Sequence, residues 1–335
     1  MAVDRRPTLV ALRALGLGDL LTAVPALRAL ADAFPDHRRV LLAPTWLRPL
    51  VALLDGAVDA VADTEGRGAP PRALPAVARG ADVAVNLHGR GPQSTELLRA
   101  AGPRRLIAFG DQRNAFGDRR NAFGEAVAWR GGEHEVARWC RMLEAHGIPA
   151  DPSRLDLRPP AGPAPAPGAT LVHPGAAAPA RRWPPERWAA VARAIGGEVV
   201  VTAGPGEEAL ACAVAEASGA GLFAGDLGAL ARLVAGAGRV VCADTGVAHL
   251  ATALGTPSVV LFGPTDPAEW GPPRDRPQHR VLWAGRRGDA NGARPDPGLL
   301  AIEPDAVLTA LVSAGDATAS PTSHQRRDRA CASSA

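Results

Sequence analysis

The chain has 335 residues, which suits two domains of about 150 residues each better than a single one. With 47% hydrophobic and 21% charged residues, its composition is that of a folded globular protein and excludes general disorder. The formal net charge of +3 comes from scattered arginines without any lysine, so we expect no nucleic-acid partner, while a weak peripheral contact with the inner face of the membrane is allowed.

Four cysteines lie far apart along the chain and lack the paired spacing of metal sites and disulfide frameworks. They are Cys140, Cys212, Cys242 and Cys331. We therefore expect idle or buried thiols, no metal and no cofactor. Residues 1–7 lead into an apolar stretch without the layout of a signal peptide, and no apolar run reaches the ~20 residues of a membrane span. The sequence thus predicts a cytoplasmic protein.

The first half alternates short apolar runs with longer amphipathic stretches, which is typical of strand-helix-strand units around a buried parallel sheet. The predicted strands are 8–13, 39–43, 57–62, 82–87 and 105–109. The predicted helices are 20–33, 46–54, 71–78, 92–100 and 133–146. These elements predict one Rossmann-like domain over residues 1–158.

The second half repeats this alternation after a linker at 159–168, where closely spaced prolines exclude a helix or a central strand. The predicted strands are 170–173, 198–202, 221–224, 239–243 and 258–262. They predict a second doubly wound domain over residues 169–314. Residues 315–335 are rich in Ser, Thr and Arg without periodicity and are predicted to be a disordered tail. The segment 109–125 repeats a seven-residue unit and is interpreted as a locally duplicated loop without an assigned role.

Two doubly wound domains place ligands at the carboxyl ends of their strands, so the loops after the strands are the candidate sites. The first such loop contains Gly16, Gly18 and Asp19, and Asp19 stands at the start of the next helix. Two interpretations are open for this carboxylate: a helix cap, which Asp favours, or a general base that faces the cleft.

The second loop runs from His173 and Gly175 to Arg181 and Arg182, just before a helix begins near Pro185. A glycine after a buried strand, followed by arginines at a helix N-terminus, supplies backbone donors and forked cations for phosphate oxygens. A solvated surface pair of arginines is the alternative.

The third loop is the strongest signal, because Asp244, Thr245 and Gly246 open a helix directly after a buried strand, with His249 one turn along it. Such an opening offers amide and hydroxyl groups to a diphosphate. A capping aspartate and a buried histidine are the alternatives. The loop with Thr265 leaves the next strand toward the same edge.

Taken together, these motifs resemble those of glycosyltransferase family 9, in the expected order from about residue 8 to residue 314. They are Leu17-Gly18-Asp19 with Pro25-Ala26-Leu27, Asn86-Leu87-His88-Gly89, His134-Glu135-Val136-Ala137-Arg138, His173-Pro174-Gly175, Arg181-Arg182-Trp183-Pro184, Asp244-Thr245-Gly246 with His249, and Gly263-Pro264-Thr265. The family contains the ADP-heptose:lipopolysaccharide heptosyltransferases. The resemblance implies a GT-B fold: two Rossmann-like, doubly wound parallel-sheet domains facing across a cleft, with the nucleotide sugar on the C-terminal one.

The resemblance also implies an inverting, metal-independent transfer of a sugar such as heptose to a cell-surface glycan or glycolipid, from an ADP-linked donor. Asp19 matches the catalytic base. The residues implied at the donor diphosphate are Gly175, Arg181, Arg182, Thr245, Gly246 and Thr265. Those implied at the donor nucleoside or sugar are His173, Glu207, Asp244 and His249. Those implied on the acceptor side are Gly18, Asn86 and His88.

Other classes of function were weighed against this resemblance. A nicotinamide oxidoreductase is disfavoured, because the glycine fingerprint after the first strand lacks its third glycine and Pro44 stands where an acid is expected. Two alternatives stay open. A nucleotide-sugar epimerase on the same fold would turn over the donor without an acceptor, and a non-catalytic nucleotide-sugar-binding subunit would bind the donor without consuming it.

Overall fold

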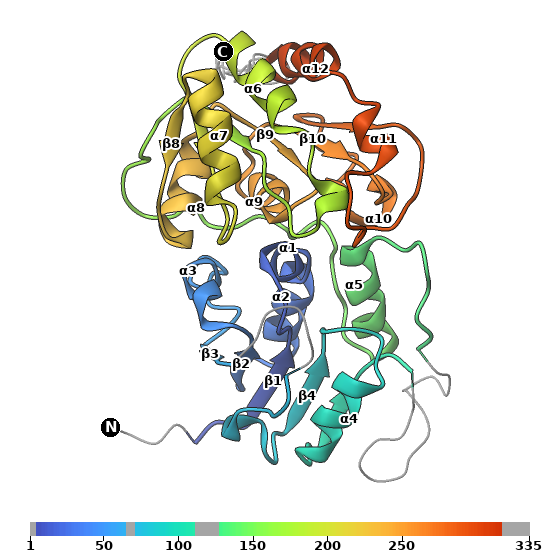
Figure 1. The fold of residues 1–335 in the computed structure, drawn as a ribbon. Coiled ribbons are helices and arrows are strands. Elements are labelled where there is room, and N and C mark those ends of the chain that lie inside the picture. Colours follow the sequence, from blue (N-terminus) through green and yellow to red (C-terminus); the bar gives the residue numbers. More distant parts are fainter. Residues whose placement is uncertain (1–4, 65–70, 111–126, 317–335) are drawn as a thin grey trace, which may run out of the picture.

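The computed structural model describes residues 5–64, 71–110 and 127–316, and all structural statements below concern these residues. They form two α/β domains, the N-terminal one at the bottom of Figure 1 and the C-terminal one at the top. The duplicated segment falls almost entirely on residues 111–126, and the tail on residues 317–335, so both lie outside the described part of the chain.

The N-terminal domain is built on a five-stranded parallel sheet with the strand order β3-β2-β1-β4-β5. Its strands are β1 (Thr8–Leu12), β2 (Arg38–Leu42), β3 (Ala60–Ala62), β4 (Val83–Asn86) and β5 (Arg105–Ile107). Its helices are α1 (Leu17–Thr22), α2 (Val24–Ala33), η1 (Thr45–Leu47), α3 (Arg48–Val51), η2 (Ala76–Ala78), α4 (Gln93–Ala100) and α5 (Glu135–Ala145). The central strand β1 is almost wholly buried, as its apolar run predicts.

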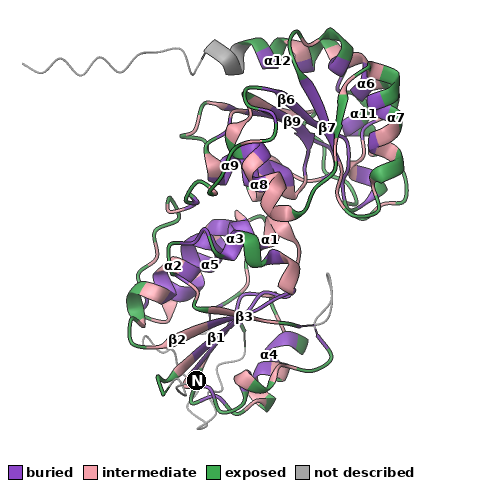
Figure 2. Cartoon of the chain, turned by 90° about the vertical axis from the view of Figure 1, so that its left-hand side faces the viewer, coloured by how far each residue is buried: buried purple, intermediate pink, exposed green. Residues whose placement is uncertain are grey.

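The C-terminal domain has a six-stranded parallel sheet with the order β11-β10-β9-β6-β7-β8. Its strands are β6 (Thr170–His173), β7 (Val199–Thr202), β8 (Gly221–Phe223), β9 (Arg239–Ala243), β10 (Ser258–Phe262) and β11 (His279–Trp283). Its helices are η3 (Pro179–Arg181), α6 (Pro185–Ala194), α7 (Glu208–Ser218), α8 (Leu227–Gly236), α9 (Gly246–Leu254), α10 (Pro267–Trp270), α11 (Pro297–Leu300) and α12 (Pro304–Asp316). Figure 2 shows buried strands at the centre of both domains.

Several predicted elements need correction. The helix 20–33 is two helices, because Pro25 occupies the second position of α2 and cannot continue the hydrogen bonds of α1. The helix 71–78 reduces to the single turn η2, which follows Pro75. The helix 46–54 is the short pair η1 and α3. The strand 57–62 begins only at Ala60, after a turn in which Asp55 and Gly56 have positive φ.

Two further corrections concern the C-terminal half. The edge strand β11 was not predicted, because it follows a loop rich in Pro and Arg rather than a helix. The predicted tail starts two residues too early, since α12 extends to Asp316. The linker 159–168 contains no helix or strand, as expected from its prolines.

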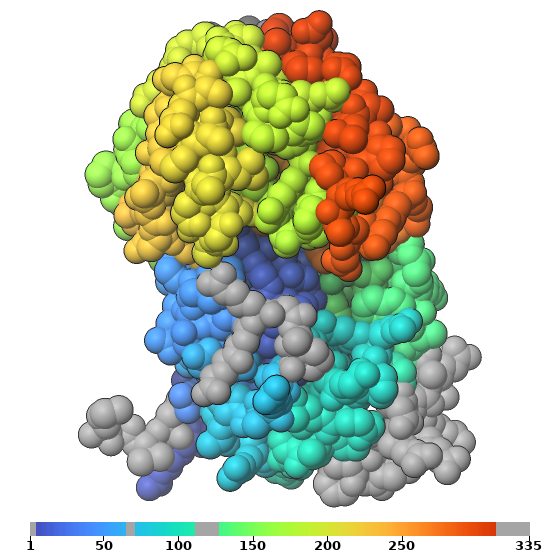
Figure 3. Space-filling view, viewed as in Figure 1, coloured from blue at the N-terminus to red at the C-terminus, as the bar shows by residue number. Residues whose placement is uncertain are grey.

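The two domains touch along a band at the middle of the molecule, visible in Figure 3. The N-terminal ends of α1 and α9 approach each other so closely that two glycines are required there. A Cβ at Gly18 would lie 2.8 Å from His249 Cδ2, and one at Gly246 would lie 2.8 Å from Leu17 Cβ. Elsewhere in the contact, His134 Nε2 lies 2.9 Å from the Gly271 carbonyl oxygen.

Candidate functional site

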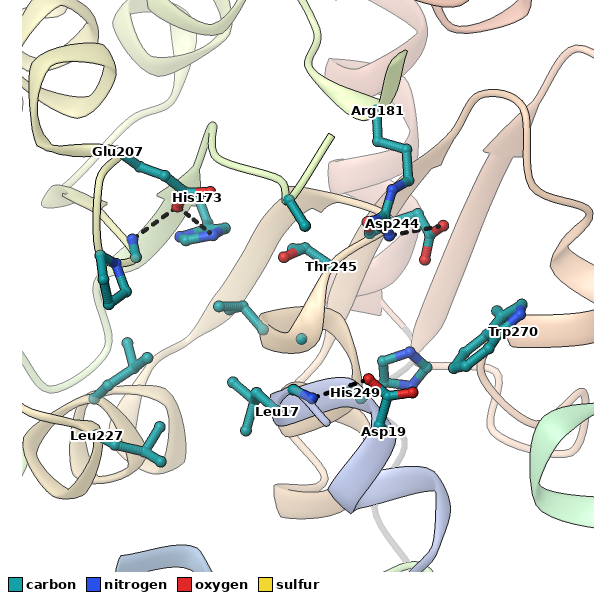
Figure 4. Close-up of a pocket in the computed structure, with 18 of the residues that line it drawn as sticks. Leu17, Asp19, His173, Arg181, Glu207, Leu227, Asp244, Thr245, His249 and Trp270 are labelled. Atoms are coloured by element: carbon teal, nitrogen blue, oxygen red, sulfur yellow. Dashed lines mark hydrogen bonds and ion pairs between the residues drawn. The ribbon is translucent and has the colours of Figure 1, made fainter. Parts of the chain in front are cut away.

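The carboxyl ends of both sheets face one cavity of about 1200 Å³ between the domains. Most predicted site residues line it, drawn from loops after β1, β6, β7, β9 and β10 (Figure 4). They are Gly18, Asp19, His173, Arg181, Glu207, Asp244, Thr245, Gly246, His249 and Thr265. Four predicted site residues are not among the lining residues: Gly175, Arg182, Asn86 and His88.

Asp19 serves as a cap and faces the cavity at the same time. It is the third residue of α1, and its Oδ2 accepts a hydrogen bond of 3.1 Å from the Gly16 amide, which would otherwise be unpaired at the helix start. Its side chain is still 30% exposed, toward the cavity. The two interpretations of this residue are therefore compatible, because one carboxylate oxygen holds the loop and the side chain remains accessible.

Arg13 is the main residue that the sequence reasoning missed. It directly follows the buried strand β1, is 1% exposed, and its Nη2 lies 3.5 Å from Asp19 Oδ1 and 3.0 Å from Glu135 Oε1. An arginine directly after an apolar strand and before a glycine-containing loop was the available signal, since buried cations require partners.

His249 lies between the two walls. Its ring stands edge to face with that of Trp270, with centroids 6.0 Å apart, and Figure 4 shows it beside Asp19. Burial lowers the pKa of His249, and the carboxylates of Asp244 and Asp19 oppose this shift. The imidazole is therefore expected to be neutral at pH 7, able to donate and accept hydrogen bonds.

The opposite wall carries a cation at the opening of α9. Arg181 Nη1 lies 3.7 Å from Asp244 Oδ2 and 3.2 Å from the Asp244 carbonyl oxygen. The buried Nε of Arg181 has no hydrogen-bond partner among the described residues. Thr245 precedes α9 without a capping hydrogen bond from its side chain, and Gly246 begins the helix. This wall thus presents a guanidinium, a hydroxyl and a helix N-terminus to the cavity.

Glu207 explains the glycine at position 175. A Cβ there would lie 1.9 Å from Glu207 Oε2, so the carboxylate occupies the space above Gly175. The same oxygen accepts from the Gly204 amide at 2.8 Å and lies 3.6 Å from His173 Nε2. Burial lowers the pKa of His173, and Glu207 opposes the shift. Gly175 therefore makes room for Glu207 and does not line the cavity.

The neighbouring Arg182 also has an internal partner. Its Nε donates to the Ala176 carbonyl oxygen at 2.8 Å and so holds the loop that precedes α6. Of the two adjacent arginines, only Arg181 lines the cavity.

Asn86 and His88 shape a loop of the N-terminal domain. Asn86 is fully buried, with Nδ2 donating to Ser94 Oγ at 3.0 Å and Thr95 Oγ1 at 2.9 Å, and with Oδ1 accepting from the His88 amide at 3.0 Å. Its polar groups are thus used within the loop. Burial and the charge of Arg13 lower the pKa of His88, while Asp19 raises it, so the ring responds to both charges.

One end of the cavity is apolar and was not predicted. Phe223, Leu227 and Leu230 line it from the C-terminal domain, and Trp46 and Pro49 from the N-terminal one. A flat aromatic ligand fits such a lining, because stacking and burial need no specific polar partner.

Two features are absent from the described residues. No group of three or more His, Cys, Asp and Glu side chains is arranged to hold a metal ion there. Within the same residues, no helix has both the length and the apolar character that crossing a membrane requires.

Comparison with solved structures identifies the fold. A glycosyltransferase family 9 protein from Veillonella parvula superposes with a TM-score of 0.70 at 20% identity, covering 95% of this chain and 99% of that one. The ADP-heptose lipopolysaccharide heptosyltransferase II of Escherichia coli gives 0.70 at 18% identity, covering 93% and 99%. The predicted GT-B class, with two parallel-sheet domains across a cleft, is confirmed.

Sequence comparison gives shorter but more similar matches. Lipopolysaccharide heptosyltransferase 1 of Salmonella typhimurium is 55% identical over 38 residues, and that of Escherichia coli K12 is 53% identical over 38 residues. Each match spans 11% of this chain and 12% of the relative. The sequence model described as glycosyltransferase family 9 (heptosyltransferase) matches residues 122–290, just over half of the chain. The chain therefore belongs to glycosyltransferase family 9.

Proposed function

We propose that this protein is an inverting, metal-independent glycosyltransferase that moves a sugar from a nucleotide diphosphate donor to a glycan or glycolipid acceptor of the cell surface. The observation that carries this proposal is the opposition of charges across one cavity. The carboxylate of Asp19 faces it from the N-terminal domain, and the guanidinium of Arg181 faces it from the C-terminal domain. A transfer reaction needs a base on one side of the sugar and a stabilised leaving group on the other.

The C-terminal wall would hold the diphosphate. The N-terminus of α9, the Thr245 and Thr265 hydroxyls and Arg181 together supply amide, hydroxyl and guanidinium donors to phosphate oxygens. In this proposal these groups stabilise the charge that develops on the leaving diphosphate, a task that a metal ion performs in other enzymes.

The N-terminal wall would activate the acceptor. Asp19 takes the proton from an acceptor hydroxyl, whose oxygen attacks the anomeric carbon of the donor sugar. The bond from that carbon to the diphosphate oxygen breaks, and the diphosphate leaves with the electron pair. One displacement of this kind inverts the configuration at the anomeric carbon. In this proposal His249, which lies beside Asp19, contacts the sugar between the two walls.

The nucleoside would occupy the apolar end of the cavity. There its base would pack against Phe223 and Leu227, and its ribose would lie near Glu207. Heptosyltransferase II of Escherichia coli, which shares this fold, is an ADP-heptose enzyme, so an ADP-linked heptose is the first donor to test. The relatives are also lipopolysaccharide heptosyltransferases, which suggests a lipopolysaccharide acceptor and would bring the enzyme to the cytoplasmic face of the membrane. That peripheral contact is part of the proposal.

A donor screen followed by a turnover assay tests the function. The purified chain is titrated calorimetrically with ADP, GDP, UDP and dTDP, and the matching nucleotide sugars are then incubated with and without delipidated or truncated glycolipid acceptors. We expect the tightest binding for ADP and nucleotide release that requires an acceptor. Release with epimerised sugar and no acceptor would identify an epimerase. Tight binding without any turnover would identify a binding subunit, and absence of nucleotide binding contradicts all three.

A further inference from the structure

Arg13 is a buried charged group beside the cavity, and each of its three guanidinium nitrogens has a hydrogen-bond partner. Its Nε donates to the Asp19 carbonyl oxygen at 2.8 Å, and Nη1 donates to the Leu87 carbonyl oxygen. Nη2 donates to Thr22 Oγ1 at 3.1 Å and to Glu135 Oε1 at 3.0 Å, and it lies 3.5 Å from Asp19 Oδ1. One buried guanidinium thus joins the loop of Asp19 to β4 and to α5.

The surroundings compensate the buried charge. Glu135 is itself buried, and its Oε1 also accepts from Trp139 Nε1 at 2.9 Å, while its second oxygen pairs with Arg138. The Arg13 guanidinium carbon lies 4.9 Å from the centroid of the Trp139 ring. A buried ion pair of this kind adds little net stability over an apolar substitute, yet removing one partner is costly. Stability alone therefore gives no reason for an arginine at this place.

The geometry gives a different reason. Asp19 is the carboxylate on the N-terminal wall of the cavity, and Arg13 contacts both its main-chain oxygen and its side chain. The Leu87 carbonyl that Arg13 holds immediately precedes His88, whose pKa responds to both Arg13 and Asp19. The planar fork of an arginine can span these separated acceptors at fixed angles, which a lysine ammonium cannot do.

We propose that Arg13, paired with Glu135, is a positioning residue that fixes the Asp19 carboxylate relative to the loop that follows β4 and contains His88. This inference rests on the proposed function, since it assigns Asp19 the role of the base. A general base must lie within hydrogen-bond reach of its proton, and a displacement of about 1 Å costs roughly a hundredfold in rate. Arg13 itself is behind Asp19 and does not contact substrate.

The test separates positioning from stability by removing both charges together. Arg13→Met with Glu135→Gln removes both charges of this pair, and the Gln oxygen still accepts from Trp139. Arg138 loses the Glu135 charge but keeps its bond to the Glu133 carbonyl oxygen and its contact with the Trp129 ring. We expect the melting temperature to stay within a few degrees of wild type and the Kd for ADP to stay within about threefold. We expect kcat for transfer to fall by about 10- to 100-fold. Arg13→Lys, which keeps the charge without the fork, should recover only part of kcat.

A matched control lies on the same helix. Arg141 pairs with Glu133 at 2.7 and 2.8 Å, away from Asp19, and the double variant Arg141→Met with Glu133→Gln removes that pair in the same way. We expect this control to keep kcat within about twofold. A folded Arg13 and Glu135 double variant that also keeps kcat within about threefold of wild type would overturn the proposal.

A second measurement does not depend on turnover. Amide hydrogen exchange read by mass spectrometry on the peptide 14–20 should become about tenfold faster in the Arg13 and Glu135 double variant and stay unchanged in the Arg141 and Glu133 control. Unchanged exchange in that peptide means that Arg13 does not fix the Asp19 loop and overturns the inference. A wild-type chain that transfers no sugar instead contradicts the proposed function, while the exchange measurement still decides the positioning.

Discussion

The two walls of the cavity contain the same pair of residue types in opposite arrangements. In the N-terminal domain, Arg13 is 1% exposed and Asp19 is 30% exposed, whereas in the C-terminal domain Arg181 is 22% exposed and Asp244 is 7% exposed. The distances between charges are nearly equal, 3.5 and 3.7 Å. Each pair is close to neutral, yet one wall presents an anion and the other a cation.

The difference shows that the charge a wall presents to the cavity depends on which residue of the ion pair the fold buries. A buried arginine holds a carboxylate that remains free to accept a proton, and a buried aspartate holds a guanidinium that remains free to meet a phosphate. In the proposed reaction, one Arg–Asp pair would support base chemistry on one side of the sugar, and the other would stabilise the leaving group. Variants that neutralise one exposed partner at a time should separate these two roles.

The largest effect is expected from the exposed anion. Asp19→Asn keeps the size of the side chain but removes the basic oxygen, so kcat should fall by about 10²- to 10⁴-fold. The Kd for ADP should change by less than about threefold, because the donor wall is untouched. Steady-state transfer rates and calorimetry measure the two quantities. A loss of ADP binding as large as the loss of kcat would contradict the division between the walls.

The next effect concerns the exposed cation. Arg181→Met should weaken ADP binding by about 10- to 100-fold, since a charge-assisted hydrogen bond contributes ~1.5–3 kcal/mol. The adjacent Arg182→Met is the matched control, because Arg182 bonds the Ala176 carbonyl and does not line the cavity. It should weaken binding less than about threefold. Equal effects of the two variants would place both arginines at the diphosphate.

A smaller effect is expected where the walls meet. Gly18→Ala places a Cβ 2.8 Å from the His249 ring, so the domains must shift apart or the ring must move, at a cost of ~1–3 kcal/mol. Thermal unfolding should show a lower Tm, with a fall in kcat as well. Gly196→Ala is the control, because Gly196 has open space around its Cβ position and no positive φ. An unchanged Tm for Gly18→Ala means that the α1 to α9 contact is looser than the structure shows.

The smallest effect on activity is expected away from both walls, at the edge strand β11. Burial, with the charge of Arg276, lowers the pKa of His279 to about 4, and its Nδ1 lies 2.9 Å from Ser258 Oγ. The unfolded chain takes up this proton near pH 6.5. The folded chain does so only near pH 4, so the stabilisation is complete above pH 6.5 and is lost as pH falls toward 4.

The variant His279→Asn should therefore reduce the drop in Tm between pH 7 and pH 5, while kcat at pH 7 stays within about twofold. Tm measured in a series of buffers checks the first expectation. If Tm falls equally between pH 7 and pH 5 in the variant and in the wild type, the fall would be assigned to the other buried histidines.

The predictability of the fold differed between elements. Strands such as β1 and β9 are buried on both faces, so their apolar runs showed them directly. Short elements were less visible: η2 and α3 are single turns shaped by prolines, and β11 is an edge strand with polar residues. In such segments the pattern of apolar and polar residues is too short to predict the element, because prolines and neighbouring strands decide the local conformation.

The site was predicted unevenly for a related reason. The donor loop from Asp244 to His249 is contiguous in the sequence, and its residues do line the cavity together. Gly175 and Asn86 also belong to the predicted motifs, but one makes room for Glu207 and the other holds its own loop. A motif specifies which residues occur, whereas the direction of each side chain depends on neighbours that it packs against.

By itself, the amino-acid sequence determined two parallel-sheet domains, the loops that line the cavity and the family to which the chain belongs. Only the tertiary structure decided which member of each ion pair reaches the cavity. It also decided that Arg13 joins Asp19 to Glu135, which lies 122 residues after Arg13 along the chain. The physical reason is that strand and helix periodicity is a local property of the chain, while burial and electrostatic pairing depend on segments that meet only after folding.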